Sequence, residues 1–377
     1  MKSLRPVFLA SFFFSVHIAL LSYLNSTVLA LHTNSLGVTL AYTVSSALSL
    51  VCLIGAGHLV RKTGSSVFLI GALALSVALL AALGTIAQTH WFVSVFVVYF
   101  SLNTVIWYAF DLVIEHYSKE TNTGNIRGIY LTLNNTGWVL APIAASAIVG
   151  VVGVSGAYIA AAVATLAGAT LILTTKHISP KSGRVPRISF TEAFRALARH
   201  PYARRIVTLY FVIQFFFAWM VIYLTPHLQG IGFSFGVIGI ILSTMLLPFV
   251  LFQYWTGKVV DKYRNEQHLL ALGFLIAGIA TYALAFPLPA KPVVFAAILF
   301  VTRIGASIIE VAAESAFFKH VTERDTALIS TLRMTIPLAY IIAPLTGALV
   351  LAYGSIQLLF GILASILVLS FVYATRL

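Results

Sequence analysis

The sequence predicts an all-α membrane protein in which twelve transmembrane helices form two pseudo-symmetric bundles of six. Of its 377 residues, 60% are hydrophobic and only 9% are charged, whereas soluble domains carry about 25% charged residues. A soluble fold could not cover this much apolar surface, so the chain is expected to cross a membrane many times. A series of apolar runs and an internal repeat set the number of crossings and their grouping.

Apolar runs of about 20 residues, the length at which an α-helix spans a bilayer, recur along the whole chain. The first run follows Lys2 and Arg5 as a signal peptide would. It is too long for one and contains His17 and Asn25, so it is expected to remain as the first helix. The twelve predicted spans are 6–30, 37–60, 65–87, 91–116, 127–149, 153–175, 205–226, 233–256, 267–287, 292–318, 326–352 and 355–374.

The one long connection is basic and divides the chain into two halves. It predicts an N-terminal bundle at 1–175, a cytoplasmic linker at 176–204 and a C-terminal bundle at 205–377. Within the linker, "SFTEAFRALARH" (189–200) has the pattern of a short amphipathic helix.

The net charge of +13 is explained by membrane topology. With the N-terminus in the cytoplasm, the Lys and Arg residues of the loops and span ends all fall on the inner side except Lys291. This is the positive-inside pattern of a cytoplasmic (inner or plasma) membrane protein with both termini inside. A nucleic-acid partner is therefore not expected. The single cysteine, Cys52, excludes an intrachain disulfide framework and a multi-cysteine metal site.

The two halves repeat each other in three places. A shift of 199 residues superimposes Asp111 and Glu115 on Glu310 and Glu314. The segment "GHLVRKTG" (57–64) matches "GKVVDKYR" (257–264) in spacing. Small residues and Pro also recur, as Gly128, Gly137, Ala141–Pro142 and Ala145–Ser146 in one half and Ser330, Ala339, Ala343–Pro344 and Gly347–Ala348 in the other. Repeated halves with a site at their interface are typical of secondary transporters.

On these features the chain resembles the major facilitator superfamily over essentially its whole length. The family's loop signature reads roughly G-x-L-x-D-R-x-G-R, and this sequence has Arg61 where the acid should stand. The second copy keeps the acid as Asp261. The resemblance implies a cytoplasmic gate made of Gly57, Arg61, Lys62, Gly64, Arg127, Gly257, Asp261, Lys262, Arg264 and Arg333.

The small-residue pattern of the fifth span allows two interpretations. It resembles the family's antiporter signature at Gly128, Gly137 and Pro142. The eleventh span carries a similar pattern, which favours close helix packing instead.

In the resembled family the first, fourth, seventh and tenth helices line the central cavity, and here those spans hold most of the polar residues. The resemblance implies a substrate site formed by His17, Asn25, Asn103, Trp107, Gln214, Trp219, Tyr223, Arg303 and Ser307. Two of these assignments have alternatives. His17 can instead be a hydrogen-bonded core histidine, and Trp107 and Trp219 can serve only in packing.

The tenth span carries three charges on one narrow stripe. At 100° per residue, Glu310 and Glu314 lie within about 20° of Arg303 around the helix. Such a stripe is tolerable if it faces a water-filled cavity. Arg303 is then either an anchor for an anionic or carbonyl-bearing solute or an ion-pair partner of Glu310.

Four carboxylates are the predicted proton-coupling groups: Glu310, Asp111, Glu115 and Glu314. Glu310 is the best candidate because it lies deeper than Glu314. The alternative is a structural latch in which these acids pair with Arg333, Arg127, Arg61 or Lys62 at similar depth.

The sequence shows no nucleotide-binding loop and no metal-ligand cluster, so we expect no cofactor and energy from an ion gradient. The predicted function is a proton-coupled secondary transporter of a small organic solute, with export by antiport preferred and a monomer as the working unit. Three alternatives stay open. They are a uniporter or symporter importing a sugar-like metabolite, a lipid-modifying membrane enzyme and a sensor that no longer transports.

Overall fold

The computed structural model describes residues 4–87, 89, 91–117, 123–173, 190–263, 266–321 and 326–376. The elements named in these ranges are all α-helices, which confirms the predicted fold class. The chain folds as two compact units, Met1–Arg187 and Ile188–Leu377.

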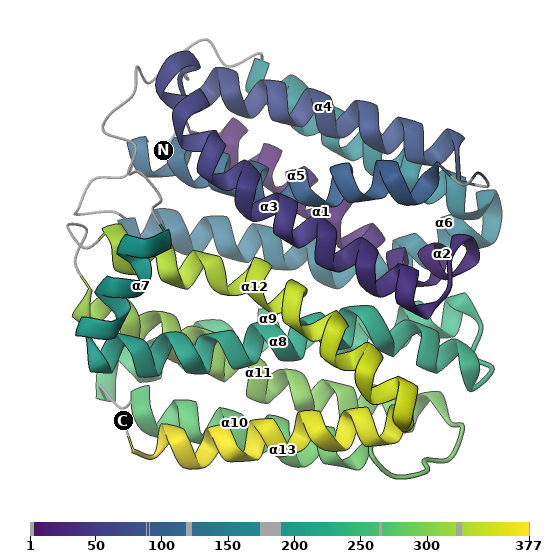
Figure 1. The fold of residues 1–377 in the computed structure, drawn as a ribbon, viewed down its shortest axis with the longest axis vertical. Helices are drawn as coiled ribbons and strands as arrows, with labels where there is room; N and C mark the ends of the chain where they lie inside the picture. Colours follow the sequence, from purple (N-terminus) through teal and green to yellow (C-terminus); the bar gives the residue numbers. More distant parts are fainter. Residues whose placement is uncertain are drawn as a thin grey trace. The chain divides into compact units, whose positions relative to one another are not determined.

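In the first unit, α1 packs along α6, while α3 and α4 both pack on α5 and α4 also contacts α6 (Figure 1). Its helices are α1 (Arg5–Ser22), α2 (Asn25–His32), α3 (Ser35–Thr63), α4 (Ser65–Thr85), α5 (Phe92–Tyr117) and α6 (Thr123–Leu173). The prediction of one helix over 6–30 is wrong, because the chain breaks between α1 and α2. Leu24 N–H donates to the Leu21 carbonyl in a tight i→i+3 turn.

The fifth predicted span and residues 153–173 of the sixth fall within α6, and residues 174–175 lie outside the described part of the chain. This element has 51 residues, but Gly153 has φ 73° and interrupts the helical backbone. A positive φ suits Gly because it has no Cβ. The apolar part, Thr132–Leu173, has 42 residues, or about 63 Å at 1.5 Å per residue. That length is enough for two crossings of a hydrocarbon core about 30 Å thick.

Ten segments of the described residues are long and apolar enough to span a membrane. Counting Thr132–Leu173 as two gives one more. The ninth predicted span corresponds to α10, whose 18 residues make a helix of about 27 Å. The twelve predicted spans are therefore all represented.

In the second unit, α11 packs against α8, α9 and α10, while α13 packs beside α10 and α12 beside α8 (Figure 1). Its helices are α7 (Phe190–Arg199), α8 (Pro201–Gly230), α9 (Phe235–Tyr263), α10 (Glu266–Ala283), α11 (Pro292–His320), α12 (Thr326–Tyr353) and α13 (Ile356–Ala374). The predicted amphipathic helix in the linker is confirmed as α7.

Glycines allow α10 and α11 to approach closely. A Cβ on Gly305 would lie 2.6 Å from the backbone nitrogen of Ala277, and one on Gly273 would lie 2.8 Å from the carbonyl oxygen of Gly305. On α11, Gly305 is about 200° around the helix from Arg303. One face of α11 is therefore fixed against α10, and the charged stripe lies on the opposite face.

The small-residue pattern in α6 contacts α1. A Cβ on Gly137 would lie 3.1 Å from Cγ2 of Val16. One turn away, the hydroxyl of Ser15 donates to the carbonyl of Asn134 at 2.8 Å, and the Ser11 hydroxyl donates to the Asn134 side chain at 3.2 Å. These contacts support the packing interpretation of the pattern.

Candidate functional site

The buried guanidinium of Arg303 lies against aromatic rings of α8. Its side chain is 1% exposed. Its Cζ atom is 4.7 Å from the ring centroid of Phe216 and 5.6 Å from that of Phe217. These distances fit cation–π contacts, which strengthen when water is excluded. Nothing in the sequence pointed to these two partners, because Phe side chains are common along the spans.

The two glutamates of the stripe bind neutral side chains on two neighbouring helices. Gln253 of α9 donates from Nε2 to Oε2 of Glu310 at 2.8 Å. Tyr210 of α8 donates its hydroxyl to Oε1 of Glu314 at 3.2 Å. Arg333 is partly buried on α12. The two glutamates of the stripe thus face polar side chains contributed by α8 and α9.

Sequence reasoning missed Gln253 and Tyr210. The only signal for Gln253 was a single amide within an apolar run, and its partner could not be inferred without the rotation of α9. The predicted site residue Ser307 lies on α11 between Arg303 and Glu310, and its hydroxyl donates to the carbonyl of Ile304 in the same helix at 2.9 Å.

The predicted aromatic site residues of α8 hydrogen-bond to α12. Trp219 donates from Nε1 to the Ala343 carbonyl at 2.5 Å, and the Tyr223 hydroxyl donates to the Pro344 carbonyl at 3.1 Å. A Cβ on Gly347 would lie 2.6 Å from Cζ of Tyr223, so this glycine makes room for the ring. These side chains therefore join α8 to the proline-containing part of α12. Gln214, also predicted for the site, is buried on α8.

In the first unit, the predicted site residue His17 of α1 pairs with a polar side chain of α5. Nε2 of His17 is 2.9 Å from the hydroxyl of Tyr99, and the predicted residue Asn103 lies about one helical turn along α5 from Tyr99. His17 is fully buried against the rings of Phe14 and Tyr99. This environment is that of a hydrogen-bonded core histidine.

The remaining predicted residues of the first unit have other partners. Asn25 accepts a hydrogen bond from the Tyr158 hydroxyl at 2.7 Å. Trp107 packs edge-on against Phe14, with ring centroids 5.1 Å apart. Asp111 is partly buried on α5.

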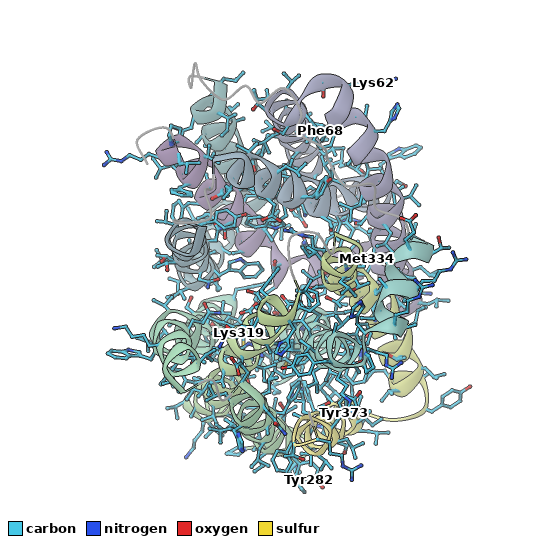
Figure 2. The ribbon with its side chains drawn as sticks, turned by 90° about the vertical axis from the view of Figure 1, so that its left-hand side faces the viewer. Lys62, Phe68, Tyr282, Lys319, Met334 and Tyr373 are labelled. Atoms are coloured by element: carbon cyan, nitrogen blue, oxygen red, sulfur yellow. The ribbon has the colours of Figure 1, made fainter. Side chains whose placement is uncertain are left out.

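Part of the predicted cytoplasmic gate lies within the described residues. Gly64 joins α3 to α4 with φ 85°, and its N–H donates to the Val60 carbonyl at 2.8 Å. Gly57 is buried on α3, and Gly257 is partly buried on α9. Lys62 is exposed and points away from its unit (Figure 2). The side chains of Arg61, Glu115, Arg127, Asp261 and Lys262, and all of Arg264, lie outside the described part of the chain.

Several helix ends of the second unit are joined by an ion pair and hydrogen bonds. Lys319, labelled in Figure 2, forms an ion pair with Glu266. Arg205 donates from Nη1 to the Arg376 carbonyl at 2.7 Å, and Gln267 donates to the Thr375 carbonyl at 2.8 Å. Within the described residues, no three His, Cys, Asp or Glu side chains are grouped to hold a metal ion.

The apolar helices define a membrane protein with many crossings, and comparison with known proteins gives its family. The sequence model of the Major Facilitator Superfamily matches residues 6–236 and 212–377, so the chain belongs to this superfamily. This confirms the resemblance and identifies the chain as a transporter rather than an enzyme.

One similar solved structure is a bacterial homolog of the human lysosomal transporter Spinster, in an inward-facing and unoccupied conformation. The two share 15% sequence identity at a TM-score of 0.72, over 100% of this chain and 91% of the other. No curated protein sequence matches.

Proposed function

We propose that this chain is a proton-coupled secondary transporter that exports a small organic solute across the cytoplasmic membrane by alternating access. The monomer is the working unit, and both termini are cytoplasmic. The observation that carries the proposal is the pairing of Glu310, within a membrane helix, with the neutral amide of Gln253 at 2.8 Å.

A neutral amide partner suits a group that gains and loses a proton. The Gln253 NH₂ donates to the Glu310 carboxylate, and after rotation the amide oxygen can accept from the carboxylic acid. Glu310 therefore keeps a hydrogen bond in both states. A latch would instead hold its carboxylate with a cation and resist protonation. Glu314, bonded to Tyr210, lies one helical turn nearer the cytoplasm and is the second proton site in this proposal.

Arg303 defines the kind of solute that we expect. A guanidinium presents a planar fork of donors that fits a carboxylate or another flat anionic or carbonyl group. The rings of Phe216 and Phe217 add an apolar surface beside it. The preference for export rests only on the resemblance of the α6 pattern to an antiporter signature, since the contacts of that pattern with α1 support packing.

The first experiment identifies a solute. A panel of small organic acids, amides and cations is added to the purified chain at pH 6 and pH 8, and the melting temperature is recorded. Binding to the folded state raises the apparent stability by mass action. Linkage requires that a coupled solute bind with different affinity at the two pH values.

The second experiment uses proteoliposomes with an imposed pH gradient and the solute so identified. Glu310→Gln should abolish gradient-driven accumulation but leave solute exchange without a gradient largely intact. Glu266→Gln, a carboxylate at a helix end, is the matched control and should still accumulate solute. Normal accumulation by Glu310→Gln would exclude Glu310 as the proton carrier. A native chain that equilibrates solute without responding to the gradient would be a uniporter.

A further inference from the structure

We propose that α7 carries a binding surface for anionic lipid headgroups, formed by Arg195 and Arg199 with Phe194 at its edge. We call this the arginine face. The helix lies across the ends of α8 and α12 rather than along them (Figure 1), and it contacts both. A helix that crosses the ends of membrane-spanning helices runs parallel to the bilayer surface.

The turn between α7 and α8 follows from the sequence. Helix α7 ends at Arg199 and α8 begins at Pro201, with only His200 between them. A proline disfavours the helical conformation of the residue before it, and His200 has φ −116° and ψ 87°. Since α8 is a membrane-spanning candidate, this junction keeps α7 at the level of the lipid headgroups.

The two faces of α7 have different environments. Ala193 is fully buried against the unit, and Leu197 is partly buried. Arg195 and Arg199 are exposed and lie roughly 200° and 240° from Ala193 around the helix. Phe194 is 53% exposed, about 100° from Ala193. An interfacial helix has this arrangement, with basic residues facing headgroups and an aromatic ring at the apolar boundary.

The surrounding charge is predominantly positive. Arg204 extends the exposed basic surface beyond the helix. Glu192 is the acidic residue of α7, and it lies in the first turn, where the helix dipole already favours a negative charge. Lys319 and Arg205 are engaged within the unit by Glu266 and the Arg376 carbonyl.

Headgroups fit this surface better than free anions or nucleic acid. The exposed phenyl ring of Phe194 can enter an apolar phase beside the arginines, and a bilayer supplies both phosphate and acyl chains at this depth. Free phosphate would satisfy only the charge. A cytoplasmic leaflet with anionic lipids attracts basic segments next to spanning helices.

The binding test uses the full-length chain in a neutral detergent. Short-chain phosphatidylglycerol, short-chain phosphatidylcholine or inorganic phosphate is titrated in, and the melting temperature reports binding. One surface arginine contributes roughly a fivefold effect. The double variant Arg195→Gln/Arg199→Gln should therefore bind phosphatidylglycerol about 25-fold more weakly, with phosphatidylcholine unaffected. Lys291→Gln, the same charge change before α11, is the control and should bind normally.

A second readout reports whether the helix enters the lipid phase. Phe194→Trp is placed in nanodiscs of phosphatidylcholine with phosphatidylglycerol, and brominated acyl chains should quench its added fluorescence. Unchanged phosphatidylglycerol affinity in the double variant would overturn the proposal. So would displacement by equal concentrations of inorganic phosphate, which would indicate a simple anion site. Absence of quenching would instead indicate an aqueous surface suited to a protein partner.

Discussion

The ion pair between Glu266 and Lys319 joins the first residue of α10 to the end of α11. Burial alone raises the pKa of the Glu266 carboxyl, but the hydrogen bond from Lys319 and the charges of Lys319 and His320 lower that pKa below its ordinary value. A carboxyl with a lowered folded-state pKa adds stability above its unfolded-state pKa. That stability is lost as the pH falls through the folded-state value.

Lys319→Gln should therefore lower the melting temperature at pH 7 and have little effect near pH 3. The pair is partly exposed, with side-chain exposures of 35% and 13%, so we expect a loss of about 0.2–1 kcal/mol. Melting curves of the purified native chain and of Lys319→Gln between pH 3 and pH 7 measure this loss of stability. Lys62→Gln, at an exposed lysine, is the control. A difference that persists at pH 3 would show that the lysine acts through packing.

At the same scale, the sequence revealed charged site residues but not their partners. Arg303, Glu310 and Glu314 could be found because a charge within an apolar run is conspicuous and helical geometry fixes their common face. Gln253, Tyr210 and Tyr99 could not, because a pairing between helices depends on the rotation and depth of both. The partners predicted for Glu310, such as Arg303 and Arg333, were therefore cationic residues, because charge was the only property that the sequence could match.

The crossing of α10 and α11 is set by Gly273 and Gly305. Gly305→Ala should destabilise the chain by about 1–3 kcal/mol, because the new Cβ would meet the backbone of Ala277 and the helices would have to separate. Thermal or denaturant unfolding in detergent measures the loss. Gly71→Ala in α4 is the matched control, since nothing lies within 4 Å of its Cβ. Its better helix propensity should leave stability unchanged or higher by up to about 1 kcal/mol.

Equal stability of the two alanine variants would mean that α10 and α11 separate at little cost.

At this element scale the sequence predicted span positions well, because each span needs about 20 apolar residues. It did not predict the break between α1 and α2. The length of an apolar run indicates the length of a crossing. A tight turn such as that from Leu21 to Leu24 does not change the hydropathy of the run, so hydropathy cannot reveal it.

For the whole molecule, the remaining expectation concerns its orientation in the membrane. The basic residues of the loops predict that both termini and the connection between the halves are cytoplasmic. In each unit the described helices can be assigned an inner and an outer end. Leu36, at the start of α3, and Lys291, before α11, are exposed and belong to outer ends. Ala198, exposed on α7, belongs to an inner end.

Single cysteines test this orientation after Cys52→Ser removes the native thiol. Leu36→Cys and Lys291→Cys should react with a membrane-impermeant maleimide added to intact cells, because an outer position is reached without crossing the bilayer. Ala198→Cys should react only after the cells are opened. The opposite labelling pattern would reverse the topology and place α7 outside. It would also contradict the assignment of the Glu310 side of α11 to the cytoplasmic half, since α11 runs from Lys291 toward Lys319 without a break.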